Sequence, residues 1–339
     1  MSLIKSISIV WESSEEGGVN SYLKYLINSN LFKEKKIYIY TNNKNKGAKI
    51  LEEDLKNNSN VEFKYFKSYF DNENKNTAKM IFLHILNPIF LILSIIKFYS
   101  LLSRTRSEVL FCQCGNYGAI GSEMGAIFAA KYLKIPVISM VVHHACRKPP
   151  FLSVFIMKLV DNLISKSLTS LISVSKATKN SIFYNSSLLD SGRLKDVVIY
   201  NGVPKVNFQK EDHINLKKFC EDKNILKIGM ISRLDPHKGH DDLLFAFSKL
   251  PENLKNKIKI FISGADRNEY KSKLLLLCNK LLIEKSVIFL DYIKEDSQKI
   301  ISSLDLLVSL TKSYEGFGLS VAEAMSVETP ILATDVGAI

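Results

Sequence analysis

The segment 304–338 alternates between apolar runs and a glycine loop, and this order leaves few folds open. An apolar run at 306–310 is followed by the glycine loop at 316–318, a helix-forming segment at 319–327 and a second apolar run at 331–334. Strand, loop, helix and strand in this order form a βαβ unit, whose two strands lie parallel in one sheet. The segment therefore predicts an α/β fold built on parallel sheet.

The loop inside this βαβ unit is a candidate binding site. Gly316 and Gly318 allow the backbone to turn tightly and to approach a ligand, and the N–H groups at the start of the helix favour an anion. Glu315 and Glu323 flank the loop, and carboxylates at the C-terminal end of a strand can accept hydrogen bonds from sugar hydroxyls. An ordinary βα turn, with a solvated Glu315 and a helix-capping Glu323, explains the same residues.

The whole segment resembles the glutamate-x7-glutamate signature, with its following proline turn, of the family 4 retaining glycosyltransferases. These enzymes use nucleotide sugars and have the GT-B fold, and Glu315 and Glu323 occupy the two acidic positions. The resemblance implies that Glu323 binds the ribose of the donor and that Glu315 lies against the donor sugar. It also implies a set of donor-binding residues around the leaving diphosphate, namely Gly316, Phe317, Gly318 and Leu319.

A second loop, at 233–239, follows the strand expected at 226–232 and precedes a helix expected at 241–250. Its cations Arg233 and Lys238 repel each other and the helix dipole, which favours a diphosphate that neutralises both. A solvated loop is the simpler alternative. The resembled family carries an arginine and a lysine-glycine here, so the resemblance implies that both cations hold the diphosphate and stabilise its charge as it leaves, with no metal ion.

The first half of the chain offers weaker matches. Gly17 and Gly18 form a turn after a strand at 6–10, where the family has a Gly-Gly turn that faces the donor diphosphate and the acceptor. Glu12, just before this turn, has no role that the sequence assigns. A strand at 135–142 ends at His143, the closer match to a family histidine that points at the donor sugar; His144 is the alternative, since adjacent strand residues face opposite sides.

The sequence also departs from the family pattern. Asp291 stands where a glycine is usual, Thr311-Lys312 where proline-serine is usual, and Glu328 where a glycine commonly precedes the Pro330 turn. The resemblance is strongest over 227–239 and 287–337, and weaker over 6–23, 135–144 and 171–203. Members of the family have further βα units after the point where this chain ends, so we expect an incomplete C-terminal domain.

With 339 residues, of which 46% are hydrophobic and 24% charged, the chain predicts two globular domains. An Asn201-Gly202 turn followed by Pro204 indicates the hinge. The family resemblance further implies a GT-B arrangement of two Rossmann-like domains facing across a cleft. The N-terminal domain, 1–204, would hold the acceptor and the C-terminal domain, 205–339, the nucleotide-sugar donor.

The formal net charge of +12 predicts an acidic partner, and nucleic acid, anionic lipid and phosphorylated small molecules all satisfy it. Much of the charge lies in Asn/Lys-rich runs that are typical of solvated loops, and no nucleic-acid reader module is recognisable, so we expect no nucleic-acid partner. The five scattered cysteines predict neither a zinc site nor a disulfide. The N-terminus lacks a signal-peptide pattern, so we expect a cytoplasmic protein, either free or peripheral on the inner face of the cell membrane.

The most apolar segment, 80–102, admits three interpretations. Asn87-Pro88 is expected to break the helix and Lys97 lies in its second half, which favours a pair of buried core helices over a transmembrane span. The third interpretation is an interfacial surface that docks on an anionic membrane through aromatic residues and lysines.

The resemblance to the family 4 glycosyltransferases implies a retaining hexosyl- or N-acetylhexosaminyltransferase. It would need neither metal nor cofactor, and the acceptor would be a lipid-linked or cell-surface glycan, as in polysaccharide biosynthesis. Two alternatives remain: a nucleotide-sugar epimerase of the same fold, which would release free sugar and nucleotide, and a non-catalytic nucleotide-binding remnant.

Overall fold

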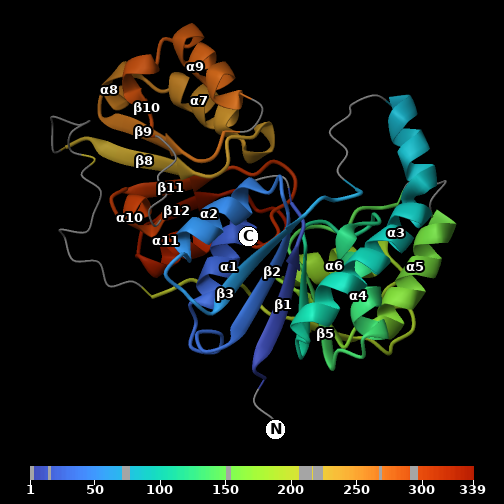
Figure 1. The fold of residues 1–339 in the computed structure, drawn as a ribbon. Coiled ribbons are helices and arrows are strands. Elements are labelled where there is room, and N and C mark those ends of the chain that lie inside the picture. Colours follow the sequence, from blue (N-terminus) through green and yellow to red (C-terminus); the bar gives the residue numbers. More distant parts are fainter. Residues whose placement is uncertain are drawn as a thin grey trace. The chain divides into compact units, whose positions relative to one another are not determined.

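The computed structural model describes residues 4–13, 17–70, 77–149, 154–205, 216, 224–266, 269–290 and 297–339, with side chains within 77–105 described from Leu86 onward. The chain forms two compact units, Met1–Gly202 and Val203–Ile339 (Figure 1). The division falls two residues before the expected boundary at 204. Gln298 donates from Nε2 to the Pro204 carbonyl oxygen at 3.0 Å, which fixes the start of the second unit to its own core.

The first unit is built on a parallel sheet whose strands lie in the order β3-β2-β1-β4-β5-β6-β7. Every pairing is parallel, and Trp11 at the end of β1 lies opposite Gln113 on β4. The chain reverses its direction of travel across the sheet between β1 and β4. The strands are β1 (Ser6–Trp11), β2 (Lys36–Asn42), β3 (Val61–Phe66), β4 (Val109–Cys114), β5 (Val137–Val142), β6 (Ser170–Ser173) and β7 (Lys195–Val198).

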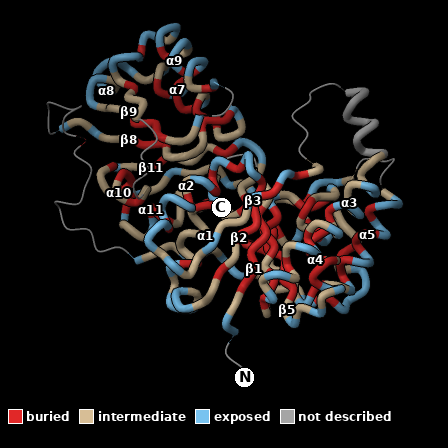
Figure 2. Tube along the Cα trace, viewed as in Figure 1, coloured by how far each residue is buried: buried red, intermediate tan, exposed pale blue. Residues whose placement is uncertain are grey.

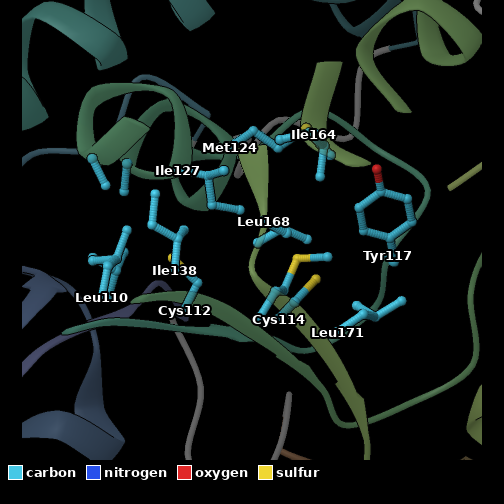
Figure 3. Close-up of a cluster of buried hydrophobic side chains, with 14 of the residues drawn as sticks. Leu110, Cys112, Cys114, Tyr117, Met124, Ile127, Ile138, Ile164, Leu168 and Leu171 are labelled. Carbon is cyan, nitrogen blue, oxygen red and sulfur yellow. The ribbon is translucent and has the colours of Figure 1, made fainter. Parts of the chain in front are cut away.

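Helices cover both faces of this sheet, as expected for a doubly wound fold. On one face lie α1 (Gly18–Ile27) and α2 (Lys46–Asp54), where the Asn45 side chain accepts from Ala48 N and caps α2. The other face carries the larger core, part of which Figure 3 shows. Its helices are α3 (Thr77–Thr105), α4 (Ser122–Tyr132), α5 (Val154–Ser167) and α6 (Lys176–Asn185).

Three of the cysteines, Cys112, Cys114 and Cys146, belong to this core. Cys112 and Cys114 follow the inward face of β4 beside Met124 and Ile138 (Figure 3). Burial raises the pKa of both thiols well above their usual range, so they stay protonated. They act as small apolar core residues, whereas Cys220 lies outside the described residues.

The expected break at Asn87-Pro88 is wrong, because α3 runs without interruption from Thr77 to Thr105 with Pro88 inside it. A proline in a helix removes one hydrogen bond, to the carbonyl four residues earlier, but the part of α3 that follows Pro88 packs against α4 and is held in place there. The packing is close: a Cβ on Gly125 of α4 would lie 2.3 Å from Ser94 Oγ of α3. The segment is therefore one long helix and not a buried pair.

The second unit repeats the architecture on a smaller scale, with parallel strands in the order β10-β9-β8-β11-β12. Helices α7 and α9 pack on one face, α10 and α11 on the other. The strands are β8 (Leu226–Ile231), β9 (Ile258–Ser263), β10 (Val287–Phe289), β11 (Leu306–Ser309) and β12 (Ile331–Ala333). The helices are α7 (His240–Ser248), α8 (Glu252–Lys255), α9 (Tyr270–Lys280), α10 (Ser297–Ile301) and α11 (Leu319–Ser326), with single turns η4 (Pro236–Lys238) and η5 (Glu284–Ser286).

The βαβ unit expected over 304–338 is present as β11, α11 and β12, and the prediction of two parallel-sheet, Rossmann-like domains is confirmed. The end of α11 explains why a glycine is usual at position 328. Glu328 has a φ of 60°, and Thr329 N donates to the Ala324 carbonyl oxygen at 3.0 Å, which together make a Schellman cap. The backbone of residue 328 therefore lies in the left-handed region, which glycine adopts without steric strain.

Candidate functional site

The loops singled out in the second unit meet at one edge of its sheet. One follows β8 and the other follows β11, and these are the neighbouring strands between which the strand order reverses. In open α/β sheets, ligands bind at the carboxyl ends of the strands at this switch point. The topology therefore brings Arg233, Lys238 and Glu315 to the place where such a fold binds its ligand.

Backbone and side-chain contacts lock the two loops together. His237 donates from Nε2 to the Tyr314 carbonyl oxygen at 3.1 Å, and Lys312 N donates to the His237 carbonyl oxygen at 2.9 Å. Gly239 has a φ of 82°, and a Cβ there would lie 2.3 Å from the Leu310 carbonyl oxygen. A glycine is thus required by both conformation and space, and a side chain at 239 would force the loops apart.

At the centre of these loops, Lys238 Nζ lies 2.6 Å from Glu315 Oε2. Thr311 Oγ1 donates to the same oxygen at 3.0 Å. Both charged side chains are largely buried, at 18% and 17% exposed, so this charge-assisted contact is held in partly desolvated surroundings. From the sequence, only a diphosphate was expected to neutralise Lys238. Its internal partner Glu315 was not predictable, because no spacing rule connects residues 77 positions apart.

Arg233 lies at the start of the same loop. Its Nε is 3.9 Å from Asp235 Oδ2, while Asp235 Oδ1 accepts from His237 N at 3.0 Å and caps the turn η4. The aspartate therefore holds the loop in shape and places an acidic group beside the guanidinium. Arg233 remains at the end of β8, from which a planar, bidentate donor can reach phosphate oxygens.

The glycine loop brings Gly316, Phe317 and Gly318 to the start of α11, with Leu319 as the first residue of that helix. Gly318 is the N-cap with a φ of 81°, and no side chain caps the helix, so the N–H groups of its first turn have no intrahelical acceptor. After β12 the chain returns to this loop: Ala338 N donates to the Glu315 carbonyl oxygen at 2.9 Å. The backbone of Glu315 is thus tied to the segment that follows β12.

Glu323 lies one turn into α11 and is 3% exposed. Burying a carboxylate costs free energy unless the carboxylate is paired or hydrogen-bonded, so the Glu323 side chain is expected to be held in place by its surroundings. The simpler interpretation of the sequence made Glu323 a helix cap, but Gly318 is the N-cap of α11 and no side chain caps this helix.

A second charged contact lies nearby and was not expected. Lys312 Nζ lies 2.9 Å from Asp241 Oδ2 and 3.2 Å from Asp242 Oδ2, at the first turn of α7. The hydrogen bond to Asp241 raises the pKa of Lys312. This lysine, which stands where the family has a serine, ties the β11 loop to the start of α7.

In the first unit, the candidate residues lie at the carboxyl ends of β1 and β5. Gly17 N donates to Asn20 Oδ1 at 3.1 Å, and α1 begins at Gly18. A Cβ on Gly18 would meet no atom within 4 Å. Among the described residues, nothing fills the space beside Gly18, which is compatible with a glycine that faces a ligand.

His143 follows β5 and is turned toward α1. Its Nε2 lies 2.9 Å from Gln113 Oε1, and its ring makes an edge contact with Tyr22 at 4.9 Å between centroids. Burial lowers the pKa of His143 to about 3, so the imidazole is neutral near neutral pH. A neutral ring that donates from Nε2 leaves Nδ1 as an acceptor. His144 lies elsewhere, with its Nδ1 3.0 Å from Asn116 Nδ2.

Glu12 has a structural partner that the sequence did not reveal. Its Oε2 accepts from Ser122 N at 3.0 Å, so the carboxylate sits at the start of α4, where the helix dipole favours it. Glu123 is the next residue, and burial, reinforced by the charge of Glu12, raises the pKa of Glu123 to about 7. These two carboxyl groups lie at the switch point between β1 and β4.

Among the residues that the structure describes, no cluster of three or more histidine, cysteine, aspartate or glutamate side chains could hold a metal ion. Positive charge in the second unit's site comes from Arg233, Lys238 and the start of α11. Glu15 and Glu16, beside the glycine turn, and Asp291 lie outside the described residues.

Comparison with known proteins supports this description of the second unit. Residues 211–339 match the family model described as "Glycosyl transferases group 1". An uncharacterized glycosyltransferase of Methanocaldococcus jannaschii, MJ1607, is 32% identical over 175 residues, which cover 49% of this chain and 42% of that protein. The poly(ribitol-phosphate) alpha-N-acetylglucosaminyltransferase of Staphylococcus aureus is 35% identical over 109 residues, 32% of this chain and 21% of that protein. The chain spans less than half the length of these relatives.

Solved structures match over almost the whole chain. Anabaena HepE in complex with UDP and glucose has a TM-score of 0.69 at 17% identity and covers 98% of this chain and 82% of its own. S. aureus TarM, in complex with Fondaparinux, alpha-GlcNAc-glycerol and UDP, has a TM-score of 0.63 at 15% identity and covers 98% and 86%. The two-domain fold is therefore that of the GT-B glycosyltransferases, and the second unit carries the group 1 sequence pattern.

Proposed function

We propose that the protein transfers a sugar from a nucleoside-diphosphate sugar to an acceptor with retention of anomeric configuration. The observation that carries the proposal is the Lys238–Glu315 contact, held by two interlocked loops at the switch point of the second unit. A cation, a carboxylate and a helix start are gathered there, and these groups suit a diphosphate joined to a sugar. The group 1 match over the same residues supports the assignment.

In this proposal the second unit binds the donor. Arg233, Lys238 and the N–H groups at the start of α11 hold the diphosphate, while Glu323 accepts from the ribose and Glu315 faces the sugar. Solved structures with this fold contain UDP, UDP-glucose or glucose, which makes UDP-sugars the first donors to test. Because the protein itself supplies the positive charge, no metal ion or other cofactor is required.

The reaction then proceeds on one face of the donor sugar. The bond from the anomeric carbon to the diphosphate oxygen breaks, the acceptor oxygen forms a bond to the same carbon, and the acceptor proton passes to the departing diphosphate. Lys238 and Arg233 stabilise the negative charge on the leaving group, and Glu315 stabilises the positive charge on the sugar. His143, neutral and held by Gln113, orients the substrate without taking the proton.

We further propose that the first unit binds the acceptor and that the acceptor is a lipid-linked or cell-surface glycan. The names of similar proteins support this class. One relative is a poly(ribitol-phosphate) alpha-N-acetylglucosaminyltransferase, and one structural neighbour is a lipopolysaccharide outer core galactosyltransferase, WaaB. The transferred group would be a hexose or an N-acetylhexosamine.

A thermal-shift screen of nucleoside diphosphates and their sugars tests donor binding. A bound ligand at a hundredfold excess over its dissociation constant raises the free energy of unfolding by about 2.7 kcal/mol. Lys238→Ala serves as the control and should lose most of this shift. If every nucleotide fails to shift the wild-type protein, or shifts the variant equally, the donor assignment is wrong.

Product analysis then tests the reaction. With the donor identified, transfer to an acceptor glycan should give a glycoside whose anomeric configuration, measured by NMR, matches that of the donor. An inverted product would refute retention, and free sugar with nucleotide, formed at the same rate without acceptor, would instead identify an epimerase or hydrolase.

A further inference from the structure

The long helix α3 presents an apolar stripe to solvent. Its buried side holds Ser94, Phe98 and Leu102, and Phe98 packs against the rings of Tyr40 and Phe66. The opposite side repeats at three- and four-residue intervals, so its members fall on one face of the helix. They are exposed large side chains, Ile89, Ile92, Leu93, Ile96 and Tyr99.

Helix α5 carries a second stripe of the same kind. Met157, Val160 and Ile164 face the core, while the exposed side combines large apolar residues with lysines. Both α3 and α5 pack against α4, which is buried along most of its length, whereas pale blue stretches mark solvent exposure along α3 and α5 (Figure 2). We call the two stripes the outer α3–α5 face; on α5 it comprises Phe155, Ile156, Leu159 and Leu163, with Lys158 and Lys166 among them.

The charges on this face have one sign. In the described parts of α3, α4 and α5, the acidic side chains are Glu123 and Asp161, and neither is exposed. Asp161 is buried and accepts from Tyr117 Oη at 2.6 Å and Ser187 N at 2.8 Å. The exposed cations in these helices are Arg104, Lys131, Lys158 and Lys166.

Exposed apolar side chains together with lysines favour one kind of partner for the outer α3–α5 face. An anionic lipid surface offers apolar contact and negative headgroups together, whereas a symmetric second copy would bring lysines against lysines. We therefore propose that the outer α3–α5 face docks on an anionic lipid bilayer. Its apolar side chains enter the boundary between headgroups and acyl chains, and Lys158 and Lys166 contact the headgroups.

Helix α3 lies on this surface and does not cross it. The stretch Leu86–Thr105 is long and apolar enough to span a membrane by length and composition. However, Phe98 and Leu102 belong to the core of the first unit, and Lys97 Nζ donates to the Lys67 carbonyl oxygen at 2.7 Å and lies 3.9 Å from the Tyr69 ring centroid. A spanning helix would have to give up all of these contacts.

Vesicle flotation of the purified full chain tests the proposal. We expect binding to vesicles that contain phosphatidylglycerol and much weaker binding to phosphatidylcholine alone. Ile92→Glu with Ile96→Glu, and separately Leu159→Glu, should abolish binding, and Lys158→Ala and Lys166→Ala should each weaken it about fivefold. Leu276→Glu on α9 is the matched control, since Leu276 is 72% exposed and Ile96 61%, so both substitutions leave a core intact.

A fluorescent probe gives a positive readout of insertion. The single native tryptophan, Trp11, is 2% exposed and supplies a constant background. Ile96→Trp should shift to shorter wavelength with anionic vesicles and be quenched by brominated acyl chains, while Leu276→Trp should do neither.

Three results would overturn the proposal: no binding of the wild-type chain to anionic vesicles, equal binding by the Ile92/Ile96 variant and the control, or an unquenched Ile96→Trp probe. Sedimentation in the absence of lipid tests the other occupant. If the wild-type protein is a dimer and the Ile92→Glu, Ile96→Glu variant is a monomer, the outer α3–α5 face binds a second copy of the chain instead of lipid. These readouts do not involve sugar transfer, so they stand apart from the proposed function.

Discussion

The contact between Lys238 and Glu315 predicts that two neighbouring substitutions act on nucleotide binding in opposite directions. In the ligand-free protein, Glu315 Oε2 holds Lys238 Nζ at 2.6 Å. A diphosphate that binds Lys238 must share it with this carboxylate, and its own negative charge then lies near Glu315. Removing the carboxylate charge should therefore tighten the binding of a nucleoside diphosphate, whereas removing the lysine should weaken it.

The expected magnitudes follow from the burial of the pair. A hydrogen bond to a charged group contributes about 1.5–3 kcal/mol, and both side chains here are largely buried. Lys238→Ala should weaken UDP binding by about 2 kcal/mol, roughly thirtyfold. Glu315→Gln keeps the shape of the side chain and its contact with Thr311, and should strengthen UDP binding by about 1 kcal/mol, roughly fivefold.

Turnover should separate the two variants further. In the proposed reaction Glu315 stabilises positive charge on the donor sugar, so Glu315→Gln should lower kcat although it tightens UDP binding. Glu323→Gln should chiefly raise the donor KM, because a contact to the ribose strengthens the ground state and the transition state alike.

Isothermal titration with UDP and steady-state kinetics measure these effects. Lys312→Ala is the matched control: it removes the same charge from the neighbouring loop, but its partners are Asp241 and Asp242. It should weaken UDP binding less than fivefold, because an exposed ion pair contributes about 1 kcal/mol or less. If Glu315→Gln weakened UDP binding as much as Lys238→Ala does, then Glu315 and the diphosphate would not compete for Lys238.

Three further predictions concern backbone, pH and metals. Glu328→Gly should raise the free energy of unfolding, measured in urea titrations, by about 1 kcal/mol because it relieves a left-handed φ. Lys273→Gly within α9 is the control and should lower the free energy of unfolding by a similar amount. A lower free energy of unfolding in both variants would contradict the glycine-type cap at the end of α11. Glu123→Gln should stabilise the protein at pH 8 and have little effect at pH 4. The pKa of Glu123 in the folded state is about 7, above the usual 4.5, so the wild-type protein loses up to about 3 kcal/mol of unfolding free energy as pH rises through that interval. A gain in stability that does not depend on pH would refute this cause. Transfer should survive EDTA, and activity that is lost with chelator and restored by Mn²⁺ or Mg²⁺ would contradict the proposed charge stabilisation.

The strands and the order of elements were predictable because their signal is local. Apolar runs such as 306–310 and 226–232 are short and bounded by turn residues, and they appear as β11 and β8 within two residues of the expected limits. The loop at Gly318 was predictable for the same reason, since a left-handed N-cap before a helix favours glycine.

The errors arise where tertiary packing decides. Pro88 carries a strong local signal for a break, but α3 is held to α4 by close contacts such as that of Ser94 with Gly125. The same helix looked like core by composition, yet its described part exposes large apolar side chains along one side. Hydrophobicity alone does not say which side of a helix packs against a partner. Glu12 is a similar case: its acceptor role at α4 joins residues 110 positions apart, and the sequence carries no trace of that contact.

The departures from the family pattern are compensated by contacts around Glu315. Thr311, in place of proline, donates to Glu315 Oε2, and Lys312, in place of serine, bridges to Asp241 and Asp242 at the start of α7. Two carboxylates in the first turn of α7 would otherwise add negative charge close to a bound diphosphate, and Lys312 offsets them. Lys238 can then exchange its contact with Glu315 for a phosphate oxygen without leaving Glu315 unpaired, since the Thr311 hydroxyl still donates to it. The substituted loop thus keeps the electrostatics that the proposed donor binding requires, and Thr311→Val combined with Lys312→Ser should weaken UDP binding more than either change alone.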